Sequence, residues 1–255
     1  MTMLGNTMHG TASFGQTALI TGGSRGIGAA IAERLAQDGF SVMINYASSE
    51  PEANEVVNRI ENAGGMAIPV QGDVSNPAAV RRMFDIAECQ FGGLDVLVNS
   101  AGLMKLATLA ETDDALFNRH IDINLRGTFN TLREAAKRLR DGGCIVNLSS
   151  SVVGLYQPTY ATYAATKAGV EAMTRVMAKE LRGRNISINA VAPGPTATSL
   201  FLDGKPKAAI NALANLSPLE RLGLPEDIAA TVSFLASSGG RWIHGQVVRA
   251  NGGVI

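Results

Sequence analysis

Cysteine is scarce in this chain, and neither sign of charge is in excess. Only Cys89 and Cys144 are present among 255 residues, which gives no disulfide framework and fits a reducing compartment, so we expect a cytoplasmic protein. The 22 basic and 22 acidic side chains cancel. With no overall field to attract nucleic acid or an anionic membrane surface, we expect neither as a partner. Chemistry on a small molecule is favoured instead.

Long apolar runs and metal-ligand clusters are also missing. No segment reaches the roughly 18 apolar residues of a membrane-spanning helix. Residues 1–15 have neither the basic stretch nor the apolar run of a signal peptide, and we expect them to form a flexible N-terminal tail. The histidines, His9, His120 and His244, are far apart and lack ligand-like spacing. We therefore expect no metal site and interpret them as surface or structural residues.

The remaining composition suits one large α/β domain, which we place at residues 16–255. Hydrophobic residues make up 46% of the chain, enough for a sizeable core. Short apolar, β-rich runs alternate with longer stretches of helical period, which is typical of βαβ units around a parallel sheet with helices on both faces. The expected strands are 17–21, 41–46, 66–71, 96–99, 144–149, 187–192 and 247–250. The expected helices are 26–37, 51–63, 77–91, 113–139, 160–182 and 225–236.

Five of the expected strands end at, or within two residues of, a residue suited to a ligand site. These residues are Gly22, Asp73, Asn99, Ser150 and Pro193. In an open parallel sheet, ligands bind outside the carboxyl ends of the strands. Residues from distant segments are therefore expected to meet in one crevice.

A glycine-rich turn, TGGSRGIG at 21–28, joins the first strand to the first helix. Gly22 permits the tight turn, Gly26 lets the backbone approach a pyrophosphate, and Gly28 allows close packing of the helix, whose N-terminus would face the anion. A glycine-rich turn without a ligand is the alternative. The expected cofactor contacts in this turn are Gly22, Ser24, Arg25, Gly26, Ile27 and Gly28.

The end of the second strand bears on which dinucleotide binds. The residues there are Asn45, Tyr46, Ala47 and Ser48. An Asp at this point would bind a ribose 2′-hydroxyl and repel a 2′-phosphate, but residues 42–49 contain no carboxylate. Arg25 and Ser48 could hold the phosphate. We therefore expect NADP(H) to be preferred, with NAD(H) possible.

Two further turns could border the dinucleotide. Asp73 and Val74 follow the third strand, and Asn99, Ala101 and Gly102 follow the fourth. Simple turn chemistry is the alternative interpretation, because Asx and glycine residues favour turns whether or not a ligand is present.

Tyr163 and Lys167 form a candidate acid/base pair. Four residues apart on a helix, they lie on one face, so the lysine ammonium is expected to lower the phenol pKa from its ordinary value of about 10. Ser150 could hydrogen-bond the substrate oxygen that Tyr163 protonates. The thirteen-residue spacing to Tyr163 selects Ser150, whereas counting back from Gly154 selects Ser151. We favour Ser150.

Taken together, the segments TGGSRGIG, NSAG and YAATK, the serine after the fifth strand and PGPTAT at 193–198 resemble the short-chain dehydrogenase/reductase family. The resemblance covers nearly the whole chain and is closest to the 3-oxoacyl-carrier-protein reductase-like branch. It implies a single Rossmann-like, doubly wound domain, a nicotinamide cofactor and hydride transfer to or from a carbonyl or alcohol carbon. A homotetramer is implied as well.

The resemblance also implies roles for individual residues. Tyr163 would be the general acid in reduction, Lys167 would lower its pKa and bind the nicotinamide ribose, and Ser150 would orient the carbonyl. Asn124 matches a fourth catalytic residue, which supports a proton-relay water beside the lysine. The segment that closes on the nicotinamide carboxamide contributes Pro193, Gly194, Thr196 and Thr198.

The substrate pocket is expected to be mostly apolar and to suit a neutral ketone. Its walls would be Leu103, Met104, residues 152–160 and an insert at 196–216 that could act as a lid. The expected polar groups are Tyr156, Gln157 and Tyr160.

The substrate and the direction of reaction stay open at this point. One reading is an NADP-dependent reductase of a 3-oxoacyl thioester, keto ester or small ketone; the others are an alcohol or sugar dehydrogenase and a non-catalytic NADP sensor. An acyl carrier protein could dock on cations near the ends of two long helices, although cations there also suit the helix dipole. These cations are Lys137, Arg138, Arg140, Arg182 and Arg184. An apolar stripe at 170–181 could be core or subunit interface.

Overall fold

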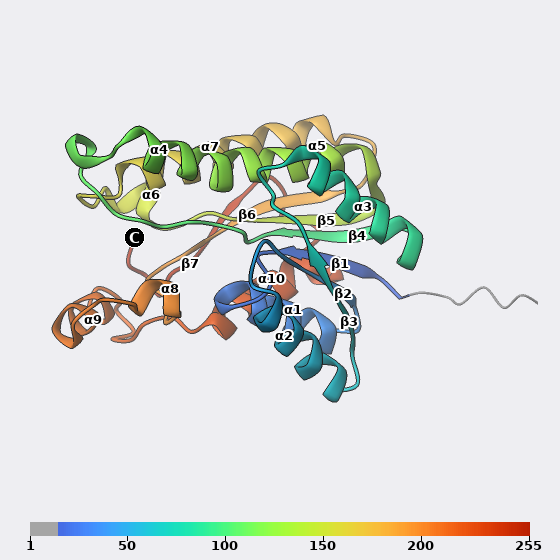
Figure 1. The fold of residues 1–255 in the computed structure, drawn as a ribbon, viewed down its shortest axis with the longest axis horizontal. Helices are drawn as coiled ribbons and strands as arrows, with labels where there is room; N and C mark the ends of the chain where they lie inside the picture. The colour runs from blue at the N-terminus through green and yellow to red at the C-terminus, as the bar shows by residue number, and fades with distance from the viewer. Residues whose placement is uncertain (1–14) are drawn as a thin grey trace, which may run out of the picture.

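A seven-stranded parallel sheet forms the centre of the molecule (Figure 1). The computed structural model describes residues 15–255, so nearly all of the tail expected at 1–15 lies outside the described residues. The strand order is β3-β2-β1-β4-β5-β6-β7. The strands are β1 (Thr17–Thr21), β2 (Ser41–Tyr46), β3 (Met66–Gln71), β4 (Leu94–Asn99), β5 (Leu139–Leu148), β6 (Ser187–Pro193) and β7 (Val247–Ala250). The predicted doubly wound α/β fold is confirmed.

Helices cover both faces of the sheet. In Figure 1, α1, α2 and α10 lie on one side and α3, α5 and α7 on the other. Shorter helices cluster at the end where the strands finish. The long helices are α1 (Gly26–Gln37), α2 (Glu50–Asn62), α3 (Pro77–Phe91), α5 (Gly127–Arg138), α7 (Ala161–Glu180) and α10 (Pro225–Ala236). The short ones are α4 (Asp114–His120), α6 (Val152–Leu155), α8 (Ser199–Leu202) and α9 (Lys207–Ala214), with 3-10 turns η1 (Leu109–Glu111) and η3 (Ser238–Gly240) and the π-helical turn η2 (Ile121–Arg126).

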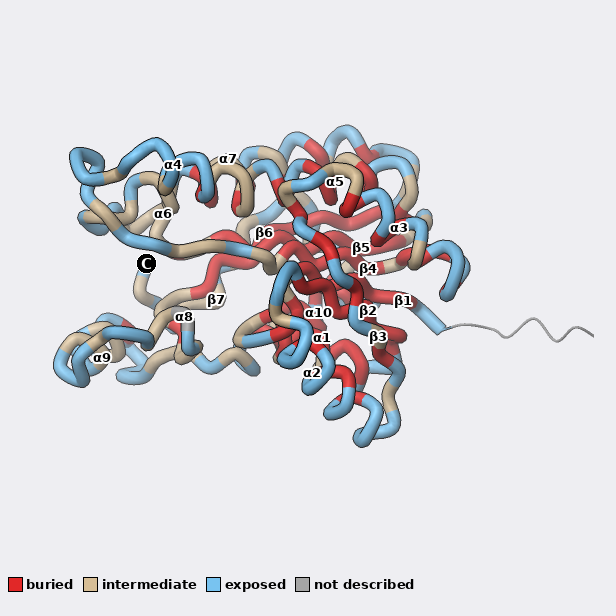
Figure 2. The backbone as a smooth tube through the Cα atoms, in the orientation of Figure 1, coloured by how far each residue is buried: buried red, intermediate tan, exposed pale blue. Residues whose placement is uncertain are grey.

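Alternate strand residues contribute their side chains to two separate hydrophobic cores, one on each face of the sheet. Ile20 and Ile44 pack with α1, α2 and α10, whereas Leu19 and Met43 pack with α3, α5 and α7. This follows from the period-2 geometry of a strand, which sends successive side chains to opposite faces. Figure 2 shows the resulting buried centre. Continuous apolar runs are therefore what a sheet covered on both faces requires.

Most of the apolar stripe along α7 belongs to the second core. Val170, Met177 and Leu181 are each at most 6% exposed, and Met173 packs against the same cluster. Its burial within this chain accounts for the stripe, so the stripe gives no support to a subunit interface.

The predicted helix over 113–139 is wrong as one continuous α-helix. The chain forms α4, then the π-helical turn η2, then α5. Within η2, the Asn124 side chain accepts a hydrogen bond from the Leu103 N–H and donates one to the Leu103 carbonyl, on the loop after β4. Gly127 follows at a crowded point, where a Cβ would come within 2.6 Å of Val74. The hydrophobic period spans both helices and does not reveal the extra residue in the turn.

Strand β5 begins earlier than predicted, at Leu139 rather than residue 144. Leu139 pairs with Leu94, and the register shifts between Leu94 and Val96. The Asp95 carboxylate holds this irregular start, accepting from Arg140 Nη1 and from the Thr17 N–H, each at 2.8 Å. The sequence does not reveal this start, because residues 140–143 are charged or glycine and the stabilising contacts come from distant residues.

The turn between β1 and α1 depends on two glycines. Gly22 has φ +63°, in the left-handed region that favours glycine. A Cβ at Gly28 would come within 2.2 Å of the Gly22 carbonyl oxygen, a rigid backbone atom. The first turn of α1 can therefore approach the end of β1 only if residue 28 has no side chain.

We predict that Gly28→Ala lowers the thermal stability of the protein. Overpacking of this kind costs about 1–3 kcal/mol, which corresponds to a fall in Tm of roughly 2–10 °C for a chain of this size. Thermal unfolding followed by circular dichroism measures the change. Gly15→Ala is the matched control, since its Cβ would lie 3.5 Å from the nearest atom. Equal Tm values for the two variants would contradict the packing argument.

Candidate active site

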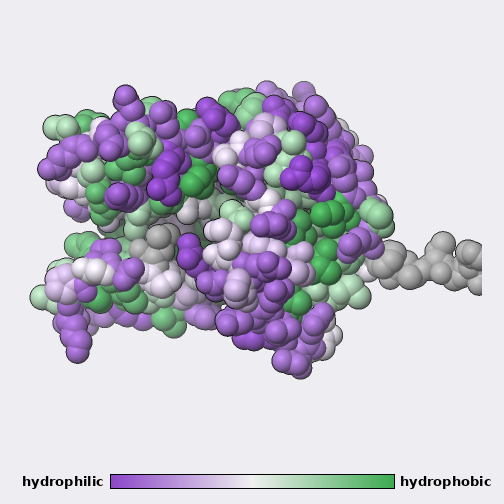
Figure 3. Space-filling view, viewed as in Figure 1, coloured by the Kyte–Doolittle hydropathy of each residue, from purple (hydrophilic) through white to green (hydrophobic). Residues whose placement is uncertain are grey.

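A large cavity opens at the carboxyl ends of the strands. Its volume is about 750 Å³, and the space-filling view shows the hollow between the two lobes of the molecule (Figure 3). Residues that follow β1 to β6 all contribute to its lining. The sheet thus brings together segments that are far apart in the sequence, as expected for an open parallel sheet.

Nearly all of the predicted site residues line this cavity, the exceptions being Asn99 and Asn124. The lining residues among them are Gly22, Ser24, Arg25, Gly26, Ile27, Gly28, Asn45, Tyr46, Ala47, Ser48, Asp73, Val74, Ala101, Gly102, Ser150, Tyr163, Lys167, Pro193, Gly194, Thr196 and Thr198.

The N-terminus of α1 is suited to an anion. Its N-cap residue, Arg25, makes no side-chain capping hydrogen bond, and the first turn contains no acidic residue. By contrast, Asn76 caps α3 and Asp113 caps α4 with side-chain oxygens. The first N–H groups of α1 therefore lack a side-chain partner at the glycine-rich wall of the cavity, which fits a pyrophosphate.

The end of β2 is suited to a second phosphate. Arg25 and Ser48 are exposed residues that line the cavity. Within the described part of the chain, the Arg25 guanidinium has no ion-pair partner. A guanidinium without an ion-pair partner and a hydroxyl are both groups that can bind a phosphate monoester.

The Asn45 side chain stabilises the strand ends at the edge of the site. Its side chain is 2% exposed, accepts from the Gly22 N–H at 3.4 Å and donates to the Gly72 carbonyl at 2.9 Å and the Val70 carbonyl at 3.2 Å. These bonds occupy the amide in joining the ends of β1, β2 and β3. Asn45 as a cofactor contact stays a prediction, since the residue also lines the cavity.

Asn99 is likewise buried in the protein and not directed into the cavity. Its amide donates to Asn147 at 2.8 Å and accepts from Thr131 at 2.7 Å. Asn147 in turn donates to Thr174 on α7 at 2.8 Å. This buried chain links β4, β5, α5 and α7. Its side chain thus has a structural role, and Asn99 as a cofactor contact stays a prediction.

Asn124 lies behind the cavity wall. It is 1% exposed and binds both backbone groups of Leu103, accepting at 2.7 Å and donating at 2.9 Å. It also donates to Thr166 at 3.2 Å. Asn124 therefore fixes the loop after β4 against α7. The relay role implied by the resemblance stays a prediction.

The structure separates the two candidate serines. Ser151 is 2% exposed, donates to the Ala192 carbonyl and accepts from Asn251. Ser150 is less buried, lines the cavity and shares a hydrogen bond with the Tyr163 phenol. Both serines line the cavity, but protein partners occupy the Ser151 hydroxyl, whereas the Ser150 hydroxyl is hydrogen-bonded to Tyr163.

The Tyr163 phenol does not have the lowered pKa that we expected. Burial is the main cause and raises the pKa of Tyr163 to about 12, although the Ser150 hydrogen bond acts in the opposite direction. Burial also lowers the pKa of Lys167 to about 8. The Lys167 Nζ donates to the Leu148 carbonyl at 2.7 Å and lies 5.7 Å from the Tyr163 ring centroid. Burial, and not the attraction between the two groups that the sequence argument assumed, sets the direction of both pKa shifts.

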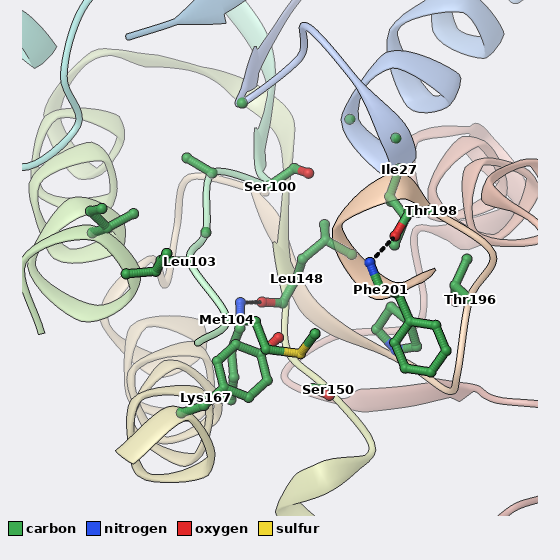
Figure 4. A pocket seen from close by; sticks show the side chains of 18 of the residues that line it. Ile27, Ser100, Leu103, Met104, Leu148, Ser150, Lys167, Thr196, Thr198 and Phe201 are labelled. Atoms are coloured by element: carbon green, nitrogen blue, oxygen red, sulfur yellow. Dashed lines mark hydrogen bonds between the residues drawn. The ribbon is translucent and has the colours of Figure 1, made fainter. Parts of the chain in front are cut away.

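Apolar side chains surround this polar group. Figure 4 shows Leu103, Met104 and Phe201 near Ser150 and Lys167. Gln157 and Tyr160 also line the cavity. Tyr156 does not, since its side chain is 86% exposed, which corrects its prediction as a polar group of the pocket. The insert at 196–216 forms α8 and α9 and supplies part of the opposite wall.

His120 is a supporting residue whose position the sequence analysis did not foresee. It is 1% exposed; its Nε2 accepts from the Lys105 N–H at 3.3 Å, so Nδ1 carries the proton and donates to Leu116 at 3.0 Å. Its ring also packs edge-on against Tyr163, with centroids 6.4 Å apart. The spacing of four residues between His120 and Asn124, which places both on one helix face, was the available signal.

Neither a metal cluster nor a membrane span is found in residues 15–255. No group of three or more His, Cys, Asp or Glu side chains is arranged to hold a metal ion. No helix there is both long and apolar enough to cross a bilayer.

Two solved structures that share this fold were determined with NADP bound. A short chain dehydrogenase from Burkholderia cenocepacia J2315 in complex with NADP is 37% identical, with a TM-score of 0.90 over 95% of this chain and 98% of that one. The angucycline C-6 ketoreductase LanV with bound NADP is 35% identical, with a TM-score of 0.89 over 95% and 96%.

Curated relatives match at higher identity. A short-chain type dehydrogenase/reductase from Picea abies is 47% identical over 94% of this chain and 93% of its own length. An NADPH-dependent aldehyde reductase-like chloroplastic protein from Arabidopsis thaliana is 42% identical over 94% of both. A family model described as Enoyl-(Acyl carrier protein) reductase matches residues 22–255. The chain is an oxidoreductase enzyme that belongs to the short-chain dehydrogenase/reductase family.

Proposed function

We propose that this enzyme reduces the carbonyl group of a small ketone to a secondary alcohol with NADPH. One observation carries the proposal: the Tyr163 phenol shares a hydrogen bond with Ser150 inside a cavity whose glycine-rich wall fits a dinucleotide phosphate. The NADP-bound relatives and the reductases among them support the same assignment. Keto esters, 3-oxoacyl thioesters and simple ketones are the candidate substrates.

The protonation state of Tyr163 favours the reductive direction. Carbonyl reduction needs a proton donor at the substrate oxygen, whereas alcohol oxidation needs a base. With its pKa raised to about 12 by burial, the Tyr163 phenol keeps its proton at neutral pH. The side chain is therefore prepared to act as an acid.

Ser150, Tyr163 and Lys167 would orient the carbonyl, supply the proton and stabilise the resulting charge. NADPH, when bound, supplies the hydride. Ser150 and Tyr163 donate hydrogen bonds to the carbonyl oxygen, and Tyr163 transfers its proton to that oxygen as negative charge develops there. The Lys167 ammonium, which lies 5.7 Å from the Tyr163 ring centroid, stabilises the phenolate that remains.

The cofactor would be held by the glycine-rich turn and by the end of β2. The uncapped N-terminus of α1 would bind the pyrophosphate. The Arg25 guanidinium and the Ser48 hydroxyl would bind a 2′-phosphate, which gives a preference for NADP(H) over NAD(H).

We propose a free substrate and not one carried on a protein. Three of the five cations considered for carrier docking are neutralised inside this chain. Arg138 pairs with Asp85 and Glu88, and Arg140 with Asp95; Arg184 pairs with Asp141. These ion pairs leave little free positive charge to attract an acidic carrier.

Tyr163→Phe tests the proposed function. We expect NADPH oxidation by the wild-type enzyme with at least one of a short 3-oxoacyl thioester, a β-keto ester and a cyclic ketone, and a fall of at least 100-fold in kcat for the variant, since it removes the proton donor. Absorbance at the NADPH band reports the rate. Tyr156→Phe, at an exposed residue, should keep full activity. Oxidation of secondary alcohols with NADP⁺ but no ketone reduction would overturn the reductive assignment.

Arg25→Ala should weaken the preference for NADPH. Loss of a charged hydrogen bond worth about 1.5–3 kcal/mol raises the KM for NADPH roughly 10- to 100-fold, while the KM for NADH changes little because NADH lacks the 2′-phosphate. Steady-state kinetics with both cofactors measures the ratio. Equal increases in KM for NADH and NADPH would show that Arg25 does not bind the 2′-phosphate.

The pH profile of reduction should be set by Lys167 on its alkaline side. The lysine pKa is lowered to about 8, so its positive charge is lost as pH rises through about 8, while the Tyr163 proton is kept. We expect kcat/KM for NADPH, which reports the free enzyme, to be level from pH 6 to 7 and to fall above about pH 8. Lys167→Arg should move that fall to higher pH, since a guanidinium stays charged. A wild-type profile that stays level to pH 10 would contradict the role of the lysine charge.

A further inference from the structure

A second phenol lies beside Tyr163 and has no assigned task. Tyr160 precedes α7 and lines the cavity. Its ring meets that of Tyr163 edge-on, with centroids 6.5 Å apart and an angle of 62° between the planes. Tyr160 also contributes to the raised pKa of Tyr163, which places the two phenol oxygens within electrostatic range of each other. The cavity therefore has two phenols on one wall.

The Tyr160 hydroxyl is available to a ligand as a hydrogen-bond donor. Within residues 15–255 it has no hydrogen-bond partner. Partial burial raises the pKa of Tyr160, so the phenol keeps its proton at neutral pH. A half-buried donor without a partner loses hydration when a ligand closes the cavity, and this costs free energy unless the ligand supplies an acceptor.

The backbone just before Tyr160 is held in an unfavourable conformation. Thr159 has φ +73°, which is a genuine outlier for a β-branched residue. Its carbonyl accepts from the Ala107 N–H at 3.2 Å, on the loop after β4 that carries Leu103 and Met104. Strain that is held by a contact of this kind is characteristic of functional sites. Here it fixes the position at which Tyr160 enters α7.

We propose that Tyr160 is a specificity-determining residue that donates a hydrogen bond to a second oxygen of the substrate, a few bonds from the carbonyl that Tyr163 and Ser150 hold. This inference rests on the proposed function, because it assumes that the reacting carbonyl lies at Tyr163. The preferred substrate class is then a β-dicarbonyl compound, such as a β-keto ester, and not a ketone with one oxygen. The apolar walls at Leu103, Met104 and Phe201 would receive its hydrocarbon part.

The test compares a β-keto ester with a monoketone of the same chain length. In Tyr160→Phe, which keeps the ring and removes only the hydroxyl, we expect kcat/KM for the keto ester to fall about tenfold, chiefly through KM. The monoketone value should stay within about twofold. Tyr156→Phe, at the exposed tyrosine of the same loop, should change neither value. Equal losses for both substrates, or no loss for either, would overturn the proposal.

A binding measurement separates this inference from the proposed function. A β-keto ester cannot be reduced when the enzyme is saturated with NADP⁺, so its Kd in that complex can be measured by calorimetry without turnover. We expect Tyr160→Phe to raise this Kd about tenfold, with the Kd for NADP⁺ unchanged. Lack of turnover by the wild-type enzyme would count against the proposed function alone. An unchanged Kd for the keto ester would contradict the proposed hydrogen bond from Tyr160 to the second substrate oxygen.

Discussion

The cavity depends on how the chain ends its parallel strands without leaving buried polar groups unpaired. A strand that stops inside a protein exposes backbone donors and acceptors where water is scarce, and each unpaired group costs about 1–3 kcal/mol. Here side-chain oxygens and amides take the place of water. Thr21 accepts from the N–H groups of Ser100 and Ala101, and Asn45 joins the ends of three strands. These internal hydrogen bonds hold the strand ends at the cavity rim together.

The same principle fixes the loop that follows β4. Three alternate residues of this loop are each held through a backbone group: Leu103 by Asn124, Lys105 by His120 and Ala107 by Thr159. The partners come from η2, from α4 and from the segment before α7. Between the held residues, Met104 is left to face the cavity. Polar residues behind the wall thus determine where its apolar side chains lie.

Sequence reasoning predicted the fold and most of the cavity lining because both follow from local patterns. Hydrophobic period gave the strands and long helices, and the topology of a parallel sheet brought Gly22, Ser150 and Pro193 to one edge. It failed where an outcome depends on three-dimensional surroundings. Asn45 and Asn99 have side chains suited to a ligand, but buried partners occupy them. The pKa of Tyr163 was assigned the wrong direction because the cost of burial cannot be read from a spacing of four residues. The tetramer, the cytoplasmic location and the catalytic roles stay predictions.

The π-helical turn η2 has a consequence for how this chain can change by insertion and deletion. An α-helix advances about 100° per residue, so the extra residue in η2 sets α4 and α5 out of phase by about that angle. Removing one residue between Ile121 and Arg126 would leave a longer and more regular helix, with good local hydrogen bonding. It would also rotate His120 and Asn124 away from the loop after β4 while α5 stayed packed on the sheet. A shortening that improves the helix would therefore dismantle the cavity wall, so the irregular turn is a length constraint on this part of the chain.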